Sequence, residues 1–391
     1  MRFPEFSGEW KEEQLDSIAT LSKGVGISKE QLSEVGEPCI LYGELYTKYK
    51  SEIIKQIESK TDIDCSKLKR SKANDVIIPC SGETAVDIAT ARCVPFDNIL
   101  FGGDLNVISL HKYDGAFMSY QLNGKRKYDI ARVAQGVSVV HLYGDHLKAI
   151  KTYNPTLPEQ QKIAKLLSLL DERIATQNKI IDKLKSLIKG LPHKMAEIGL
   201  QKGCWEKVLL STVLVERKEL NSELYTVHSV SVSEGVINQI EYLGRSFAAK
   251  DTSNYHVARY GDIIYTKSPT GDFPYGIVKQ SYIEQPVAIS PLYGVYSPTS
   301  FETGVYLHYY FMSSVLAKNY LYPLIQKGAK NTINISNQRF LENRIALPLK
   351  QTDRHNIARA LITIQKKLDI EKCAMDSLTK QRSYLLQQLF I

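Results

Sequence analysis

The sequence lacks the features that mark several large classes of protein. Its six cysteines are scattered and no CxxC pair occurs, which excludes a zinc ribbon or a disulfide framework and suits a reducing compartment. No apolar run approaches the roughly 20 residues that a membrane-spanning helix needs. The first residues, MRFPEFSGEW, also lack the basic start and apolar core of a secretory signal. We therefore expect a soluble, cytoplasmic protein without a membrane partner.

Catalytic signatures are absent as well. The chain has no GxxxxGK phosphate loop, no HExxH zinc motif and no GxSxG nucleophile elbow. The eight histidines form no cluster. His141, Asp145 and His146 have no further ligand in suitable spacing, so we interpret them as a solvated loop. We expect no catalytic residue, no metal site and no cofactor bound by this chain, which favours binding over catalysis.

What is present is the composition of a folded protein, with 43% hydrophobic and 24% charged residues. At 391 residues the chain is too long for one ordinary domain. The net charge of +8 permits an acidic partner such as nucleic acid but does not require one. Composition therefore predicts two or three domains and leaves the partner open.

The chain contains an internal duplication. The run Ile163-Ala164-Lys165 recurs 194 positions later as Ile357-Ala358-Arg359. The only two tryptophans, Trp10 and Trp205, are 195 positions apart, and aliphatic residues follow each of them at the same spacings. The two matches have nearly the same separation, and they lie on both sides of a segment in which the sequences differ. Together they indicate two domain-sized repeats.

Each repeat ends in a long helix with a coiled-coil pattern. Its seam positions advance by steps of four and three, as the a and d positions of a coiled coil do. In the first helix they are Ile163, Leu167, Leu170, Ile174, Gln177, Ile181, Leu184, Ile188 and Leu191. In the second they are Ile357, Leu361, Ile364, Leu368, Glu371, Met375, Leu378, Arg382, Leu385 and Leu389. Gln177 and Glu371 are polar breaks at equivalent positions.

The first helix also carries end signals. Thr156 and Glu159 have the spacing of a capping box, and Gly190 and Pro192 are expected to stop the helix. Each helix would then have about 33 residues and a length of about 50 Å.

The helices have two possible partners. Each seam could pack on its own domain, but a strict repeat over more than four heptads favours a partner helix, and the obvious partner is the other copy. If a two-fold axis relates the repeats, the pair is antiparallel and the polar breaks lie close together, which fixes the register at a cost in stability. The predicted helix-pairing residues are Leu167, Leu170, Ile174, Gln177, Ile181, Leu184, Leu361, Ile364, Leu368, Glu371, Met375 and Leu378.

The predicted fold class is α+β, with two mixed α/β globular domains, each followed by a long α-helix, and the two helices paired as an antiparallel coiled coil. The predicted segments are a first domain at 1–153, a first spacer helix at 154–200, a second domain at 201–348 and a second spacer helix at 349–391.

Binding is expected in the divergent centres of the domains, where polar, basic and glycine-bearing loops adjoin apolar runs. Lysine and arginine suit phosphates, whereas glutamine, asparagine, serine and arginine can read base edges. A single basic loop is usually only a solvated loop. The candidate binding residues are Lys69, Arg70, Ser81, Thr84, Lys125, Arg126, Lys127, Gln135, Ser138, Lys267, Ser268, Thr270, Lys327, Lys330, Asn331 and Asn334.

The second domain is also rich in tyrosine. Fourteen of the 23 tyrosines lie between Tyr225 and Tyr322, and most of them are expected to pack in strands. Two domains with different binding loops, joined by a rigid spacer, are suited to bind two separated sites on a linear polymer.

Three segments resemble the DNA specificity subunits of type I restriction–modification systems. They are RFPEFSGEWKEEQLDSIATLSKG (Arg2–Gly24), QGVSVVHLYGDHLKAI (Gln135–Ile150) and LPEQQKIAKLLSLLDERI (Leu157–Ile174). The resemblance covers the whole chain as two target-recognition domains, each followed by a helical region. It implies a subunit without catalytic activity, whose domains bind a two-part asymmetric DNA target while the helices set their separation.

The resemblance also implies partners. Two methyltransferase subunits would bind S-adenosylmethionine and methylate adenine, and motor–nuclease restriction subunits would cleave unmodified DNA. The loops around Ser81, Ser138, Lys267 and Lys330-Asn331 would face double-stranded DNA.

The second junction departs from the family pattern. The first copy has Pro158-Glu159-Gln160-Gln161, whereas the second has Thr352-Asp353-Arg354-His355. Asp353 can keep a carboxylate near the helix start, but Arg354 and His355 are not expected to mimic the two amides. Equal docking of a methyltransferase at both junctions therefore does not follow.

Two other classes of function are weighed against this one. A coiled-coil scaffold that holds two protein-binding domains would need no nucleic acid, and its affinities would not fall steeply with salt as those of a DNA reader do. An enzyme that acts on DNA in its own right is disfavoured by the missing motifs.

Overall fold

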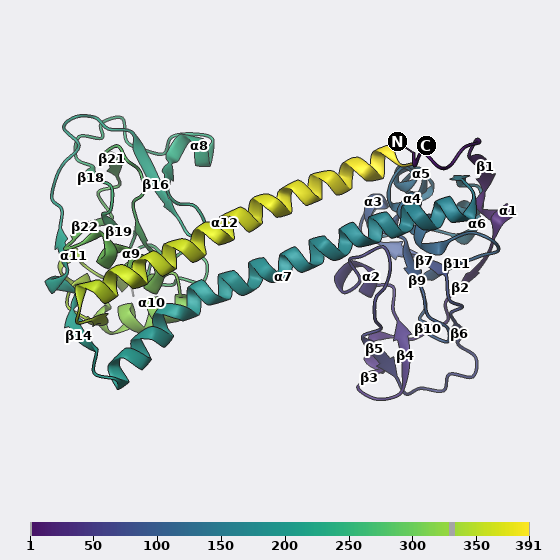
Figure 1. The fold of residues 1–391 in the computed structure, drawn as a ribbon, viewed down its shortest axis with the longest axis horizontal. Coiled ribbons are helices and arrows are strands. Elements are labelled where there is room, and N and C mark those ends of the chain that lie inside the picture. Colours follow the sequence, from purple (N-terminus) through teal and green to yellow (C-terminus); the bar gives the residue numbers. More distant parts are fainter. Residues whose placement is uncertain (1, 328–332, 391) are drawn as a thin grey trace. The chain divides into compact units, whose positions relative to one another are not determined.

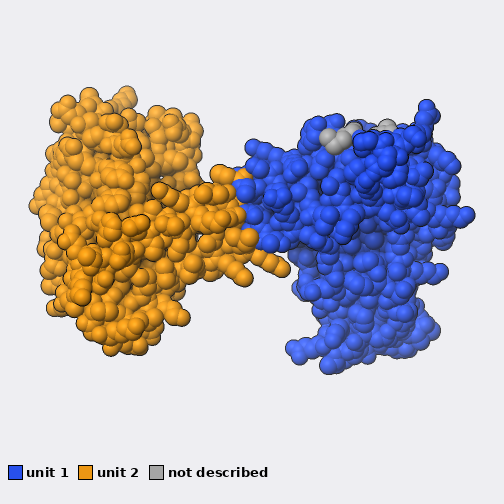
Figure 2. Space-filling view, viewed as in Figure 1, with its two compact units in different colours: residues 1–178, 374–391 blue, residues 179–373 orange. Residues whose placement is uncertain are grey.

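The computed structural model describes residues 2–327 and 333–390 and divides into two compact units (Figure 1). Unit 1 comprises Met1–Asn178 and Ala374–Ile391, and unit 2 comprises Lys179–Cys373 (Figure 2). The last stretch of the chain therefore belongs to the same unit as the N-terminal repeat.

Unit 1 is built on an antiparallel sheet of four strands with the order β2-β11-β7-β9. These strands are β2 (Ala19–Lys23), β11 (Leu105–Leu110), β7 (Asp75–Pro79) and β9 (Arg92–Val94). A five-stranded sheet consists of β3 (Leu32–Ser33), β5 (Ser59–Thr61), β4 (Glu37–Ile40), β10 (Leu100–Phe101) and β6 (Lys69–Arg70). Two further pairs are β1 (Lys11–Gln14) with β13 (Lys151–Asn154), and β8 (Ser81–Gly82) with β12 (Val140–His141).

Short helices complete unit 1. They are α1 (Leu15–Ile18), α2 (Glu44–Thr47), α3 (Ala85–Ile88), α4 (Gly115–Asn123), α5 (Lys127–Val133) and α6 (Gly144–Lys148), with a 3₁₀ turn at Lys29–Gln31.

The central strand β7 shows where the core of unit 1 lies. All five of its residues are buried, as expected of a strand that is covered on both faces. Val76 and Ile78 pack in one cluster with Met118 of α4, whereas Ile77 packs in a second cluster with Phe101 of β10. The four-stranded sheet is therefore packed between helices on one face and the five-stranded sheet on the other.

Unit 2 has a central sheet of the same kind, with the order β15-β22-β19-β20. Its strands are β15 (Leu214–Glu216), β22 (Gly294–Pro298), β19 (Ile263–Tyr265) and β20 (Val278–Gln280). A second sheet holds β17 (Gly235–Asn238), β16 (Val227–Ser231), β21 (Val287–Ile289) and β18 (His256–Ala258). Two further pairs are β14 (Trp205–Leu209) with β25 (Arg344–Pro348), and β23 (Gln326–Lys327) with β24 (Ile333–Asn334).

The short helices of unit 2 are α8 (Gln239–Leu243), α9 (Phe301–Phe311), α10 (Ser314–Leu321) and α11 (Asn337–Phe340), with 3₁₀ turns at Leu210–Thr212 and Tyr322–Leu324.

The two units repeat one topology. Strands β1, β2, β7, β9, β11 and β13 of unit 1 correspond in order and pairing to β14, β15, β19, β20, β22 and β25 of unit 2. The two tryptophans also have matching surroundings. Trp10 packs edge-on against Phe117 of α4, and Trp205 packs edge-on against Tyr306 of α9, with ring centroids 5.8 and 5.5 Å apart. The structure thus agrees with the duplication that the sequence predicts.

Two long helices, α7 (Leu157–Gln201) and α12 (Gln351–Gln388), complete the α+β fold (Figure 1). Their burial follows the predicted seam. Every predicted helix-pairing position is buried or half-buried, and Gln177 and Glu371 are both half-buried. In contrast, Leu169, Ile180, Leu187 and Ile370 lie off the seam and are exposed.

Within unit 1 the first turns of α7 pack against the last turns of α12, so the two segments run in opposite directions. One cluster contains Ile163, Leu167 and Leu170 of α7 together with Leu378, Leu385 and Leu389 of α12. A charged group lies beside it. Arg382 donates to Asp171 at 2.6 Å and to Glu52 at 2.5 Å, and the Tyr120 hydroxyl donates to Asp171 at 2.6 Å. The end of the chain is thereby held to the N-terminal repeat.

The expectation that Gly190 and Pro192 end the first helix is wrong. Helix α7 continues to Gln201, with Pro192 inside it. The buried positions along this segment are Ile188, Pro192, Ala196 and Gly199. A helical face that is buried at this spacing offsets the roughly 3 kcal/mol that a proline costs in a helix interior.

The expectation for the tyrosines is also wrong. Only Tyr265 and Tyr296 of the fourteen lie in strands. Helices α8, α9 and α10 hold five others, which are Tyr242, Tyr306, Tyr309, Tyr310 and Tyr320. Aromatic rings pack as well on a helix as on a sheet when the helix covers the core, and the Tyr320 ring contacts both Phe311 and Phe340.

Candidate nucleic-acid interface

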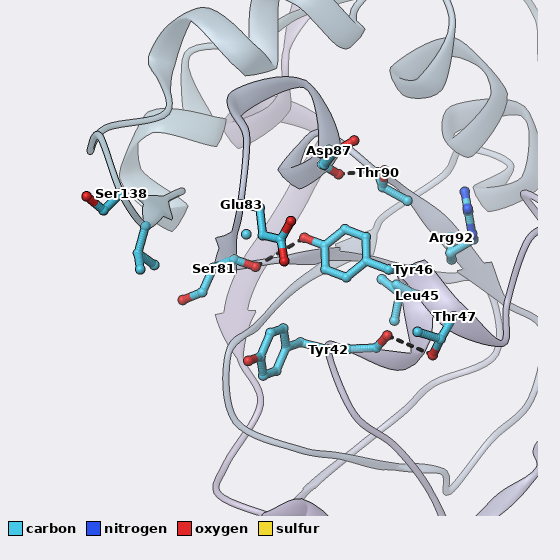
Figure 3. Close-up of a pocket in the computed structure, with 13 residues that line it drawn as sticks. Tyr42, Leu45, Tyr46, Thr47, Ser81, Glu83, Asp87, Thr90, Arg92 and Ser138 are labelled. Carbon is cyan, nitrogen blue, oxygen red and sulfur yellow. Dashed lines mark hydrogen bonds between the residues drawn. The ribbon is translucent and has the colours of Figure 1, made fainter. Parts of the chain in front are cut away.

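The first candidate site is a concave surface of unit 1 with a volume of about 700 Å³ (Figure 3). Two loops that are far apart in sequence meet there, because β8 and β12 pair with Gly82 opposite Val140 and Ser81 opposite His141. The residues that line it are Tyr42, Gly43, Leu45, Tyr46, Thr47, Ser81, Gly82, Glu83, Asp87, Thr90, Arg92, Ser138 and Val139.

The predicted residues Ser81 and Ser138 thus share one cavity. Gln135 stands at the base of the second loop, where its backbone exchanges two hydrogen bonds with that of His141, at 2.9 and 2.7 Å. Thr84 has a structural task, because its hydroxyl oxygen caps α3 by accepting from the Asp87 N–H at 3.1 Å. Sequence reasoning missed the tyrosines of this cavity, since no spacing in the sequence connects Tyr42 and Tyr46 with position 81.

The other basic candidates of unit 1 do not line this cavity. Lys69 and Arg70 form β6, and Arg70 donates to both carboxylate oxygens of Glu37, at 2.5 and 2.9 Å. Lys125 and Arg126 lie between α4 and α5, and Lys127 is the first residue of α5. The guanidinium of Arg126 lies 5.0 Å from the centre of the Tyr153 ring, and burial lowers the pKa of Lys127.

In unit 2 the predicted residues Lys267, Ser268 and Thr270 lie on the loop after β19. Lys267 has a positive φ of 61°, and a Cβ on Gly276 would lie only 2.7 Å from the Lys267 nitrogen, so the two ends of this loop are in close contact. The loop reaches the turn that precedes β23, because the rings of Tyr275 and Tyr322 are 6.1 Å apart.

Two further candidates of unit 2 lie on the paired strands β23 and β24. Lys327 lies on β23 and Asn334 on β24, and these strands are antiparallel. Lys330 and Asn331 lie outside the described residues.

The loops of the two units stand at matching places. Ile77 pairs with Val107 in unit 1, and Ile264 pairs with Val295 in unit 2. In unit 1 the isoleucine strand β7 leads into the candidate loop at Ser81, and in unit 2 the isoleucine strand β19 leads into the candidate loop at Lys267. The other candidate residues of each unit precede its last strand, β13 in unit 1 and β25 in unit 2. In unit 1 the two candidate loops adjoin, and in unit 2 the loop after β19 contacts the turn before β23.

The junction between the first domain and α7 is held by a residue near the N-terminus of the chain, Arg2. Glu159 and Gln160 are 0% and 1% exposed. Glu159 accepts from Arg2 Nε at 2.8 Å and from Arg2 Nη2 at 2.7 Å, while Gln160 accepts from the Asp114 N–H at 2.9 Å and donates to the Pro155 carbonyl at 2.8 Å. This corner therefore fastens the start of α7 to its own unit. The contact with Arg2 spans 157 positions and has no signal in the sequence.

At the second junction the expectation that Arg354 cannot mimic an amide is wrong in one respect. Arg354 Nε donates to the Pro348 carbonyl at 2.9 Å, much as the Gln160 amide donates to Pro155. Arginine has no acceptor, so it replaces the donating half of the amide but not the accepting half. His355 instead faces Glu302, at 3.3 Å.

Residues 2–327 and 333–390 hold no group of three or more His, Cys, Asp or Glu side chains that could bind a metal ion. In the same ranges no helix is both long enough and apolar enough to cross a membrane.

The chain is similar to known proteins in part of its sequence and in its fold. Residues 7–186 match the family model of the type I restriction modification DNA specificity domain. The type I restriction enzyme MjaVIII specificity subunit of Methanocaldococcus jannaschii is 24% identical over 355 residues, which cover 81% of this chain and 78% of that protein.

Solved structures share the fold along the whole chain. The crystal structure of a type I restriction–modification S subunit from M. genitalium is 17% identical, with a TM-score of 0.62 and coverage of 100% of this chain and 99% of that one. A structure that concerns complex assembly and conformational transition of the type I R-M system is 14% identical, with a TM-score of 0.54 and coverage of 98% and 97%. The family model matches the first half of the chain, and the named relative and the solved structures extend the similarity to most of its length; all of them are DNA specificity subunits of type I restriction–modification systems or structures of such a system.

Proposed function

We propose that this chain is a non-catalytic subunit that reads a two-part, asymmetric sequence in double-stranded DNA, with one unit for each part. The observation that carries the proposal is the repeat itself. The two units share one strand order, yet their matching loops hold Ser81, Glu83 and Ser138 in unit 1 and Lys267, Ser268 and Thr270 in unit 2. One scaffold with two different sets of polar side chains suits two different half-sites.

The proposed partners are two methyltransferase subunits and motor–nuclease restriction subunits. S-adenosylmethionine would be bound by the methyltransferase and not by this chain. The relative whose structure concerns assembly of the type I R-M system supports a role in a larger complex.

A domain exchange tests the proposal. The chain would be co-expressed with its methyltransferase, and methylated adenines would be mapped across the host genome. We expect a motif of two parts with a fixed gap. Exchanging residues 1–150 for those of a relative with another target should change one part and leave the other part and the gap unchanged. A single continuous motif, or a change in both parts, would contradict the assignment of one half-site to each unit.

The salt dependence of DNA affinity separates this function from a protein scaffold. A reader that neutralises several phosphates loses affinity as salt rises, with a logarithmic slope of about −0.9 for each phosphate. We expect a steep slope for the complex of this chain with its methyltransferase. A flat response, or no DNA binding by that complex, would favour the scaffold.

A further inference from the structure

Glu83 is an acidic residue in the middle of the candidate interface of unit 1. It stands between β8 and α3, lines the cavity with Tyr46 and Ser138, and is exposed (Figure 3). Other carboxylates of this region are engaged, since Asp87 accepts from the Thr84 hydroxyl at 2.6 Å and Glu44 contacts Lys48 at 2.7 Å. Glu83 has no hydrogen-bond or ion-pair partner within the part of the chain that the structure describes.

The backbone on both sides of Glu83 is fixed. Before it, Gly82 pairs with Val140, and the Ser81 carbonyl accepts from the Tyr46 hydroxyl at 3.1 Å. After it, Thr84 caps α3. Because the backbone is held on both sides, only the side-chain rotations of Glu83 remain to be ordered on binding, which limits the entropic cost of recognition.

The chemistry of a carboxylate limits what Glu83 can contact on DNA. It repels phosphates and has only acceptor atoms at neutral pH, so it adds nothing to backbone binding. In the major groove its partners are exocyclic amino groups, above all N4 of cytosine. We propose that Glu83 reads one base of the first half-site by accepting a hydrogen bond from such an amino group, N4 of cytosine or N6 of adenine. This inference rests on the proposed function.

Unit 2 has a different residue at the same distance along the chain from its central strand. Six residues beyond the paired isoleucines Ile77 and Ile264 stand Glu83 and Thr270. A carboxylate only accepts hydrogen bonds, whereas a hydroxyl can both donate and accept them. At the same distance along the chain from the central strand, unit 1 therefore carries a group that only accepts hydrogen bonds and unit 2 a group that can also donate them.

The test uses the complex of the full chain with its methyltransferase. Genome-wide maps of methylated adenine are compared for the wild type, Glu83→Ala, Glu83→Gln and the control Glu34→Gln. Glu34 is another exposed carboxylate of unit 1, and it does not line the cavity. We expect Glu83→Ala to lower the preference for the amino-bearing base at one position by about 5-fold to 100-fold. Glu83→Gln should shift that preference toward adenine, because an amide pairs with adenine N6 and N7.

The possible outcomes separate the role of Glu83 from the proposed function of the whole chain. Loss of selectivity at one position of one part, with Glu34→Gln unchanged, supports the inference, and the base lost identifies cytosine or adenine. An unchanged motif, or a uniform loss of methylation with the same motif, overturns the inference while the proposed function stands. If the wild-type complex itself yields no two-part motif, the proposed function fails first. Melting temperatures of the variants exclude misfolding.

Discussion

Lys279 in unit 2 is a buried lysine. It lies on β20, is 5% exposed and has no ion pair within the described ranges. Burial lowers its pKa to about 8. Its neighbour His308 on α9 accepts a hydrogen bond from the Gln280 N–H at 2.9 Å, and burial and the charge of Lys279 lower the pKa of His308 to about 3. Both bases therefore lie where the neutral form is favoured.

Lys279 predicts a rise in the stability of unit 2 with alkaline pH. Its pKa is lowered in the folded state, so between about pH 8 and pH 10 the unfolded chain holds a proton that the folded chain has released. The full penalty is present below about pH 8. Lys279→Met should raise the unfolding free energy at pH 7 by about 1–3 kcal/mol and remove most of the alkaline rise.

Thermal unfolding at several pH values between 7 and 10 measures both effects. The exposed Lys207→Met serves as the control and should leave the pH dependence intact. A methionine variant that melts earlier, or that keeps the alkaline rise, would show that Lys279 has a favourable partner.

At the scale of elements, the helices show what periodicity can and cannot reveal. Alternating apolar steps predict the buried seam of α7 and α12, because side chains three and four apart share a helical face. The end of α7 was not predictable in the same way. Gly190 and Pro192 have the local chemistry of a helix stop, and only the burial of Ile188, Ala196 and Gly199 in the folded chain overrides it.

Two glycines of α7 should respond in opposite ways to alanine. A Cβ on Gly190 meets nothing within 4 Å, so Gly190→Ala should stabilise unit 2 by about 1 kcal/mol through the better helix propensity of alanine. A Cβ on Gly199 would lie 2.0 Å from Cδ1 of Trp205, whose ring is buried against Tyr306. Gly199→Ala should therefore destabilise by about 1–3 kcal/mol.

Urea unfolding followed by circular dichroism measures both variants, and each serves as the control for the other. Equal shifts for the two variants would mean that the close packing of Trp205 on α7 does not limit the residue at position 199.

At the scale of the whole molecule, unit 1 is completed by the end of the chain. The cluster that joins α7 to α12 contains Leu378, Leu385, Leu389 and Phe390, and Arg382 neutralises Asp171 and Glu52 beside it. Arg382 and Glu52 are 330 positions apart, so no local pattern predicts their contact. The sequence predicts the two repeats and their helices, whereas contacts of this kind depend on the folded arrangement.

A chain that ends at Cys373 should lose the stability of unit 1 and keep that of unit 2. Four large apolar side chains at about 2–5 kcal/mol each are comparable with the whole stability of a domain, about 5–15 kcal/mol. Hydrogen exchange should show early loss of protection in β7 and β11, with β19 and β22 still protected.

A single substitution at Arg382 should destabilise unit 1 in the same way as the truncation, but by less. Arg382→Met leaves two carboxylates without their cation and should destabilise unit 1 by about 2–4 kcal/mol. Full protection of β7 in the truncated chain would mean that unit 1 folds without α12.

The participation of residues 374–391 in unit 1 has a consequence for synthesis on the ribosome. The repeat that emerges first cannot complete its hydrophobic cluster until the final helix has left the exit tunnel. At about 5–20 residues per second, the stretch from 179 to 373 delays that moment by about 10–40 seconds. Throughout this interval unit 1 is incomplete and exposes the apolar side chains of α7 and α4 that the last turns of α12 will cover, which is a natural binding surface for a chaperone.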